Sequence, residues 1–123
     1  MSTDSRTAGD HERGPLVTAE AYDTCPVTGV LRTIGDRWSP AVIRVLAERP
    51  CGFNELDRAI ERISRRMLTR TLRALEDGGL VDRTPCVPAG SRTPSRVEYA
   101  LTARGRSLRE QLRGLGVWAA ANT

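Results

Sequence analysis

Hydrophobic residues recur every three or four positions along much of this chain, and polar or glycine residues separate these stretches. The first stretch predicts a helix over Pro26–Ile34, because proline suits the first helical position. Ser39 followed by Pro40 is a capping signature, so a second helix is predicted from there to about Glu48. Residues 49–52 are expected to form a turn.

The middle of the chain predicts a helix-turn-helix. Residues 53–60 form its short first helix, and residues 61–63 form its turn. Ser64 then caps a second helix over residues 65–77, which the glycine pair at 78–79 ends. This second helix is the expected recognition helix of the motif.

After the glycine pair, hydrophobic and polar residues alternate in part, instead of hydrophobic residues recurring every three or four positions. Residues 80–87 and 96–101 are predicted strands, and the Pro-, Gly- and Ser-rich segment 88–94 between them is predicted to form a wing. Thr102 caps a last helix that extends to about Ala119. The expected fold class is therefore α+β but mostly α: a winged helix-turn-helix with a two-stranded wing and additional N- and C-terminal dimerisation helices.

The predicted recognition helix has two opposite faces. At about 100° per residue its leucines fall on one side, where they can dock on the rest of the protein. The other side carries Arg66, Thr69, Arg70 and Arg73, and Arg65 flanks them near the capping residue Ser64. In a major groove arginine can bind guanine or phosphate, and free N–H groups at the helix start can bind a phosphate. The alternative is an amphipathic helix whose arginines only face solvent.

Arginines also mark the predicted wing. Arg92 lies in the turn at its tip, and Arg96 begins the second strand. Both are candidate DNA-binding residues, because a wing can reach phosphates or a minor groove. An exposed hairpin without a ligand is the alternative. The prediction of DNA binding therefore depends on the conjunction of helix, turn, helix, strand, wing and strand.

Apolar stripes on the terminal helices point to self-association. They can pack within one chain, but a homodimer is favoured because paired half-sites raise affinity and specificity. The candidate dimer-interface residues are Val27, Leu31, Leu108, Leu112, Leu115 and Trp118. Residues 1–20 are polar and aperiodic and are expected to form a disordered tail, which leaves residues 21–123 as a single domain.

The charge pattern favours a polyanionic partner. All 19 basic residues are arginine, and the formal net charge is +4. Residues 1–20 hold two arginines against four acids, so the predicted folded part is more basic than the whole chain. The apolar stretches are too short for a membrane span, and the N-terminus lacks an apolar signal segment. We therefore expect a cytoplasmic protein without membrane association.

Catalytic chemistry is not indicated by the sequence. The single histidine lies in the predicted tail, and we find neither a glycine-rich phosphate loop nor a Cys/His metal cluster. We therefore expect no enzyme activity, no metal and no cofactor. A winged helix can also act as a protein-interaction module, which the arginine face disfavours. Cys25 precedes a predicted helix whose dipole favours thiolate, so it is a candidate redox sensor; a buried inert thiol is the alternative.

The chain resembles the HxlR-type transcriptional regulators, which are winged-helix relatives of the MarR group, in the segments CPVTGVLRTIGDRW, FNELDRAIERISRRMLTRTLRALEDGGLVDR and RVEYALTARGRSL. The resemblance covers roughly residues 25–118. It implies a homodimer that binds an inverted-repeat DNA operator through the helix at 65–77 and the wing at 88–94. Repression is the default expectation, because no activation segment is recognisable. The resemblance also aligns Cys25 with a cysteine that senses electrophiles or oxidants in some members, so a small-molecule or electrophile effector is a candidate partner.

The chain departs from the HxlR-type pattern in the helix-turn-helix. The turn often reads Pro-Gly-Ile-Ser in that family, whereas Glu61, Arg62, Ile63 and Ser64 stand here. The residue at 70, like the one at 65, is frequently polar and uncharged in the family but is arginine in this chain. These arginines are expected to strengthen phosphate binding.

Overall fold

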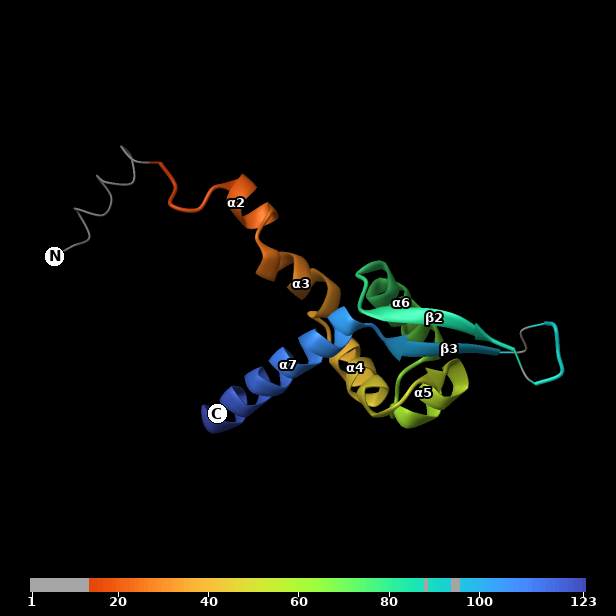
Figure 1. The fold of residues 1–123 in the computed structure, drawn as a ribbon. Coiled ribbons are helices and arrows are strands. Elements are labelled where there is room, and N and C mark those ends of the chain that lie inside the picture. Colours follow the sequence, from red (N-terminus) through yellow and green to blue (C-terminus); the bar gives the residue numbers. More distant parts are fainter. Residues whose placement is uncertain (1–13, 88, 94–95) are drawn as a thin grey trace. The chain divides into compact units, whose positions relative to one another are not determined.

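A computed structural model describes residues 14–87, 89–93 and 96–123 of the chain (Figure 1). The chain divides into two units, Met1–Arg32 and Thr33–Thr123. Of the tail predicted over 1–20, residues 1–13 lie outside the described residues. The single domain predicted over 21–123 stays a prediction. None of the helices in the described part combines the length and the apolar character that crossing a bilayer requires.

The first unit contains a helix that the sequence pattern does not predict. This helix, α2 (Ala19–Asp23), begins inside the segment predicted as a disordered tail. Thr18 caps it, since its hydroxyl oxygen accepts the N–H of Ala21 at 3.1 Å. The next helix, α3 (Pro26–Ile34), has the predicted limits, and its end from Thr33 onward belongs to the second unit.

The second unit has the predicted winged helix-turn-helix architecture (Figure 1). A first helix, α4 (Trp38–Glu48), precedes the helix-turn-helix, which consists of α5 (Phe53–Ala59) and α6 (Arg65–Asp77). Two strands, β2 (Val81–Cys86) and β3 (Arg96–Leu101), carry the wing at the end where Cys86 pairs with Arg96. A long helix, α7 (Ala103–Ala121), follows the wing. The mostly helical α+β class predicted from the sequence is confirmed.

A short third strand replaces part of the turn predicted over residues 49–52. This strand, β1 (Cys51–Gly52), pairs with β3 in antiparallel orientation, with Cys51 opposite Tyr99 and Gly52 opposite Glu98. The sheet order is β1-β3-β2, so the second wing strand is central. The prediction of a turn is wrong here because a two-residue strand has no detectable period and forms only by pairing with a distant segment.

The start of α4 also differs from the prediction. Ser39 does not cap this helix, which begins at Trp38, one residue before it. The carboxylate of Asp36 accepts the N–H groups of Trp38 at 2.7 Å and Ser39 at 2.8 Å. The Ser39 side chain is fully buried, and its hydroxyl donates to the same carboxylate at 2.9 Å. Aspartate is a strong capping residue, so it takes the role predicted for the serine.

The core of the second unit lies between the inward faces of α4, α5 and α6 and the sheet. Its buried hydrophobic residues are Ile34, Val42, Ile43, Leu46, Cys51, Leu56, Ile60, Ile63, Leu68, Leu72, Leu75, Leu80, Val81 and Leu101. The leucine face predicted for α6 is confirmed. Of the α5 positions that the helical period places inward, Leu56 and Ile60 are buried, but Ala59, the last residue of the helix, is exposed.

Both ends of α6 are fixed by hydrogen bonds. The Ser64 hydroxyl oxygen accepts a backbone N–H of the first turn at 3.0 Å, as the sequence predicts. At the other end Gly79 has a φ of 74°. Its N–H donates to the carbonyl of Glu76 at 3.0 Å, and that of Leu80 donates to the carbonyl of Leu75 at 3.0 Å. These nested bonds around a left-handed glycine form a Schellman motif, which turns the chain from α6 into β2.

The turn between α5 and α6 contains a strained residue. Arg62 has a φ of 72°, and it is the non-glycine position with a positive φ in the described part of the chain. A left-handed conformation costs a residue with a Cβ atom about 1–2 kcal/mol. Arg62 stands where the Pro-Gly-Ile-Ser pattern has glycine, so the chain keeps the turn but at a steric cost.

Hydrogen bonds join the end of α6 to the start of α7. The Thr102 hydroxyl donates to the carbonyl of Gly79 at 2.7 Å and accepts the N–H of Gly105 at 3.0 Å. The N–H of Thr102 donates to the carbonyl of Leu80 at 3.1 Å. Thr102 is thus the predicted cap of α7, and it also fixes α7 against the turn that ends α6.

Gly105 allows α7 to approach this turn closely, and its replacement tests the junction. A Cβ atom at Gly105 would lie inside van der Waals contact of the Leu80 carbonyl oxygen and 3.2 Å from Leu101 Cδ2. We expect Gly105→Ala to lower the free energy of unfolding, measured in urea, by about 1–3 kcal/mol, because the backbone carbonyl cannot move away.

Gly114 provides the matched control in the same helix. Outside the backbone of its own helix and the two adjacent residues, no described atom lies within 4 Å of a Cβ added there. Gly114→Ala should leave stability unchanged or raise it by up to about 1 kcal/mol through helix propensity. Equal stability of the two variants would contradict the close packing at Gly105.

Candidate nucleic-acid interface

One exposed face of α6 gathers the residues predicted to read DNA. Arg66, Thr69, Arg70 and Arg73 together line a hollow on the surface, and we call this set the arginine strip. The three arginines of the strip are exposed, whereas Leu68, Leu72 and Leu75 on the opposite face are buried. The folded protein therefore presents the arginines outward on a helix whose other face is fixed in the core.

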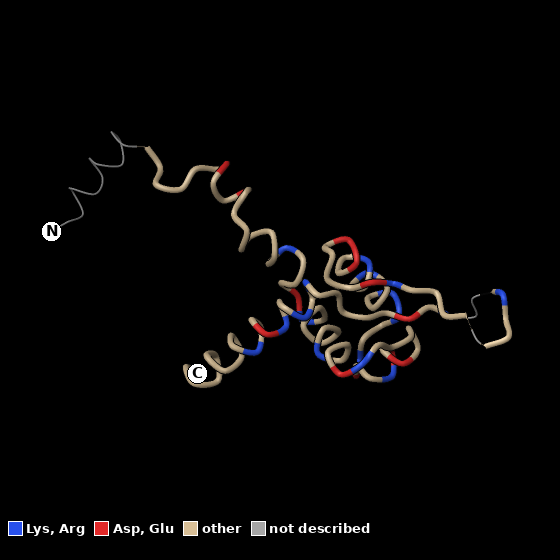
Figure 2. The backbone as a smooth tube through the Cα atoms, viewed as in Figure 1, with Lys and Arg blue, Asp and Glu red and all other residues tan. Residues whose placement is uncertain are grey.

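Electrostatics favour an anionic ligand at the arginine strip. Among the described residues, no recorded ion pair includes Arg66, Arg70 or Arg73, so no carboxylate of that part of the chain balances their charges. Figure 2 marks basic segments along α6 and at the tip of the wing. The Thr69 hydroxyl donates to the Arg65 carbonyl at 3.0 Å, so its oxygen is available chiefly as an acceptor.

Arg65 lies apart from the strip and holds the two helices of the motif together. Its Nη1 atom donates to Asn54 Oδ1 at 3.2 Å and lies 3.3 Å from Asp57 Oδ2. Its guanidinium carbon lies 4.7 Å from the centre of the Phe53 ring, which is within cation–π range. All three partners belong to α5. Arg65 thus contacts other residues of the same chain, and a helical wheel of α6 alone cannot show these contacts.

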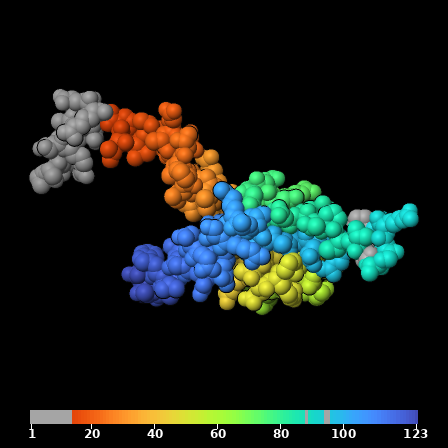
Figure 3. Space-filling view, in the orientation of Figure 1, coloured from red at the N-terminus to blue at the C-terminus, as the bar shows by residue number. Residues whose placement is uncertain are grey.

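The wing extends away from the helices as a narrow finger (Figure 3). Its tip residues 89–93 are exposed and include Arg92, while residues 88, 94 and 95 lie outside the described residues. Gly90 has a φ of 82°, a conformation that favours glycine in a tight turn. The N–H of Thr93 donates to the Ser91 hydroxyl at 3.2 Å. Arg92 is therefore presented at the outer end of the strand pair, where sequence analysis expects it.

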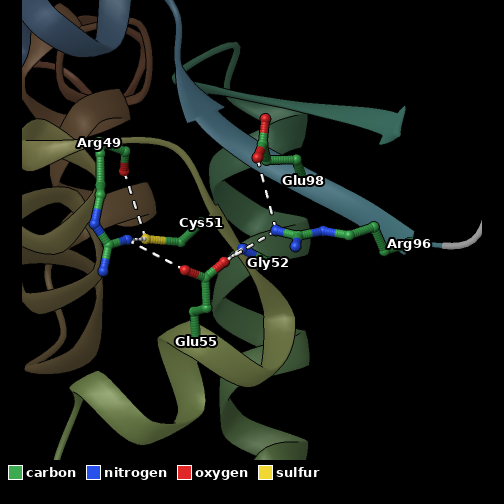
Figure 4. Close-up of polar contacts among 6 residues, drawn as sticks. All are labelled: Arg49, Cys51, Gly52, Glu55, Arg96 and Glu98. Atoms are coloured by element: carbon green, nitrogen blue, oxygen red, sulfur yellow. Dashed lines mark hydrogen bonds and ion pairs between the residues drawn. The ribbon is translucent and has the colours of Figure 1, made fainter. Parts of the chain in front are cut away.

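Arg96, at the base of the wing, is engaged by carboxylates (Figure 4). Its Nη2 atom donates to Glu55 Oε1 at 3.0 Å and lies 3.7 Å from Glu98 Oε2. Glu55 Oε2 accepts a hydrogen bond from Arg49 Nη1 at 3.2 Å, and Glu55 Oε1 accepts the Gly52 N–H at 2.8 Å. Glu55 thus connects the base of the wing with β1 and with the start of α5.

These contacts shift the titration of Glu55. The N–H of Gly52, followed by the charges of Arg49 and Arg96, lowers the pKa of the Glu55 carboxyl below its ordinary value. Sequence analysis does not identify Glu55. The available signal is its spacing, since it stands three residues after the helix-capping position Gly52, as a glutamate does in a capping box.

The cysteines are free thiols in different surroundings. Cys25, in the first unit, is partly exposed, Cys51 is buried and Cys86 is partly exposed. Hydrogen bonds from the N–H and hydroxyl of Thr28 and from the N–H of Val27 lower the pKa of the Cys25 thiol. Within the described residues, no group of His, Cys, Asp and Glu is placed to hold a metal ion.

Several predicted dimer residues are exposed in the single chain. On α3 Val27 is 63% exposed and Leu31 55%, and on α7 Leu115 is 58% exposed and Trp118 63%. The remaining pair, Leu108 and Leu112, is partly buried. Large apolar side chains exposed together along one helix mark an interaction surface.

Comparison with known proteins agrees with this geometry. The profile of the HxlR-like helix-turn-helix family matches residues 33–123, which covers the helix-turn-helix, the wing and α7. The chain belongs to the HxlR-like helix-turn-helix family. It is a transcriptional regulator with a helix-turn-helix DNA-binding fold.

Proteins similar to this HxlR-like regulator are also named as transcriptional regulators. An HTH-type transcriptional regulator of Methanothermobacter thermautotrophicus is 39% identical over 94 residues, which span 76% of this chain and 69% of the relative. The reduced form of the transcriptional regulator YodB from B. subtilis superposes with a TM-score of 0.68 at 30% identity, covering 78% of this chain and 91% of YodB. The redox regulator HypR in its reduced form gives a TM-score of 0.66 at 33% identity, covering 79% and 92%.

Proposed function

We propose that this HxlR-like regulator is a repressor that binds an inverted-repeat operator as a homodimer. The observation that carries the proposal is the arginine strip on α6, whose charges are unbalanced by described acids and whose opposite face is buried. A helix of this kind fits a major groove, where arginine can bind the O6 and N7 atoms of guanine with two hydrogen bonds. Bound at a promoter, the protein would block transcription by occupying the DNA.

The contact residues of the proposal fall into two groups. The arginine strip contacts bases. The phosphate backbone is bound by two other parts: the start of α6 at Ser64, and Arg92 at the wing tip. Arg65 and Arg96, which sequence analysis also assigns to DNA binding, are held by carboxylates of α5. Their share in DNA binding is therefore expected to be smaller.

A homodimer is supported by the exposed apolar residues of α3 and α7. Leu115 and Trp118 lie on a helix whose start is fixed to the end of α6. A symmetric contact through α7 would therefore set the spacing of the two recognition helices, which should be about 34 Å, one turn of duplex. The two-fold symmetry of such a contact is the geometric reason to expect an inverted repeat, and the spacing sets the distance between its half-sites.

Cys25 is the residue that we propose as a sensor of oxidants or electrophiles. Its lowered thiol pKa raises the fraction of reactive thiolate at neutral pH. One structural relative, HypR, is itself named a redox regulator. A sensor near an interaction helix can change DNA binding by changing the dimer.

Removal of either Arg66 or Arg70 from the arginine strip should weaken operator binding. Arg66→Ala and Arg70→Ala should each cost about 1–3 kcal/mol on an operator selected from genomic fragments, if the arginine contacts a base. Fluorescence anisotropy with operator and mismatched duplexes measures the loss. Arg106→Ala, an exposed position on α7, is the control and should bind normally. Full operator affinity in both strip variants would remove this assignment.

A charge placed in the apolar surface of α7 should dissociate the dimer. We expect Trp118→Glu and Leu115→Glu to shift the protein from dimer to monomer in sedimentation, because a carboxylate would be buried unpaired at the interface. Leu16→Glu, at a position 99% exposed in the first unit, adds the same charge and should stay dimeric. A wild-type protein that sediments as a monomer at working concentrations would contradict the dimer.

Oxidation should act on operator binding through Cys25. Diamide with glutathione converts an exposed thiol to its mixed disulfide while diamide is reduced to the hydrazine. This treatment should change the operator affinity of the wild type but not of Cys25→Ser, and Cys86→Ser should respond like the wild type. Because the Cys25 pKa is lowered, alkylation by iodoacetamide should reach half its maximal rate at a lower pH than alkylation of free N-acetylcysteine. Unchanged DNA binding of the oxidised wild type would rule the sensor out.

A further inference from the structure

The base of the wing contains a cation that the protein balances itself. Arg96 begins β3, the strand that runs back from the wing, and Gly52 of β1 pairs opposite Glu98 on the same strand. This pairing brings Glu55, which follows Gly52 on the first turn of α5, within 3.0 Å of Arg96. Two distant segments of the sequence therefore place a carboxylate against a wing arginine (Figure 4).

Carboxylates beside Arg96 offset its positive charge, so Arg96 attracts a phosphate only weakly. Two arginines, Arg49 and Arg96, pair with two carboxylates, Glu55 and Glu98, so these four paired groups carry no net charge. Arg65, which lines the same hollow, is paired with Asp57, and Arg58 beside it adds an exposed charge that does not depend on Glu55. The Arg96 guanidinium also lies over the backbone of Gly52, with Nη2 3.3 Å from where a Cβ would stand, so the glycine gives it room to reach Glu55. The arginine strip on α6 has no such balance among the described residues.

We propose that Glu55 is a specificity-determining residue: it holds Arg96 and balances its charge at the base of the wing, which limits binding to duplex of any sequence. Binding without sequence preference comes almost entirely from cations that neutralise phosphates and release counterions. A guanidinium that already has a carboxylate partner releases few counterions when it meets a phosphate. Sequence-dependent binding is thereby left to the exposed arginines of α6.

The proposal predicts a change in the salt dependence of DNA binding. Glu55→Gln keeps an oxygen that can accept the Gly52 N–H but removes the charge opposite Arg96. On a duplex of arbitrary sequence, log K should fall more steeply with log salt, by about 0.9 per subunit for one newly neutralised phosphate. Adding Arg96→Gln to the same chain should restore the wild-type slope.

Two further variants separate this role from structural support. Glu110→Gln on α7 removes a carboxylate that holds Arg109 and Arg113 and should leave the slope unchanged. Glu98→Gln removes the more distant partner of Arg96 and does not touch the start of α5, so it should steepen the slope even if Glu55→Gln fails to fold. Circular dichroism of each variant shows whether it is folded.

The outcomes distinguish this inference from the proposed function on which it rests. Weaker binding by folded Glu55→Gln with an unchanged slope, or a slope that Arg96→Gln does not restore, would show that Glu55 only supports the fold. If the wild type binds no duplex, DNA binding itself fails and this inference fails with it. A wild type that binds its operator while Glu55→Gln and Glu98→Gln keep the wild-type slope overturns this inference alone.

Discussion

The arrangement of the second unit depends on the hydrogen bonds between the end of α6 and the start of α7. A Schellman turn leaves backbone carbonyls at the end of a helix that need donors. Here Thr102 supplies them to Gly79 and Leu80, and Arg104 Nε donates to the carbonyl of Gly78 at 3.2 Å. The recognition helix and the long α7 are therefore joined as one body. Whatever orients α7 in an assembly also orients the arginine strip.

Net charge alone describes this protein poorly, because its arginines are in two different situations. Some are balanced within the chain: Arg65 by Asp57, Arg96 by Glu55, and Arg109 by Glu110. These pairs are largely exposed to solvent and contribute little to stability. Their larger effect is on where positive charge remains. Unpaired arginines are spread over several described elements, but three of them, Arg66, Arg70 and Arg73, line one hollow on the outer face of α6.

The parts that could be predicted from the sequence are those with local causes. The limits of α6 follow from a capping serine, a helical period and a glycine pair, and those of β3 follow from alternation. By contrast, β1 exists only through pairing with β3, and Glu55 meets Arg96 only because of that pairing. The helical wheel places Arg65 beside the arginine strip, yet its partners stand on another helix. Contacts between elements distant in the sequence leave no periodic pattern. The ion pairs of the site therefore could not be predicted from the sequence and became visible only in the structure.

The turn of the helix-turn-helix shows what sets the angle between its helices. Arg62 adopts a left-handed conformation at a position where glycine would be easier, so the turn sequence itself opposes the observed geometry. Ile60 and Ile63 on either side of it are buried, and Arg65 binds back to α5. Burying these two side chains is worth about 1.5–3 kcal/mol each, which exceeds the strain. The direction of the arginine strip is therefore set by packing at both ends of the turn, which outweighs the strain at its centre.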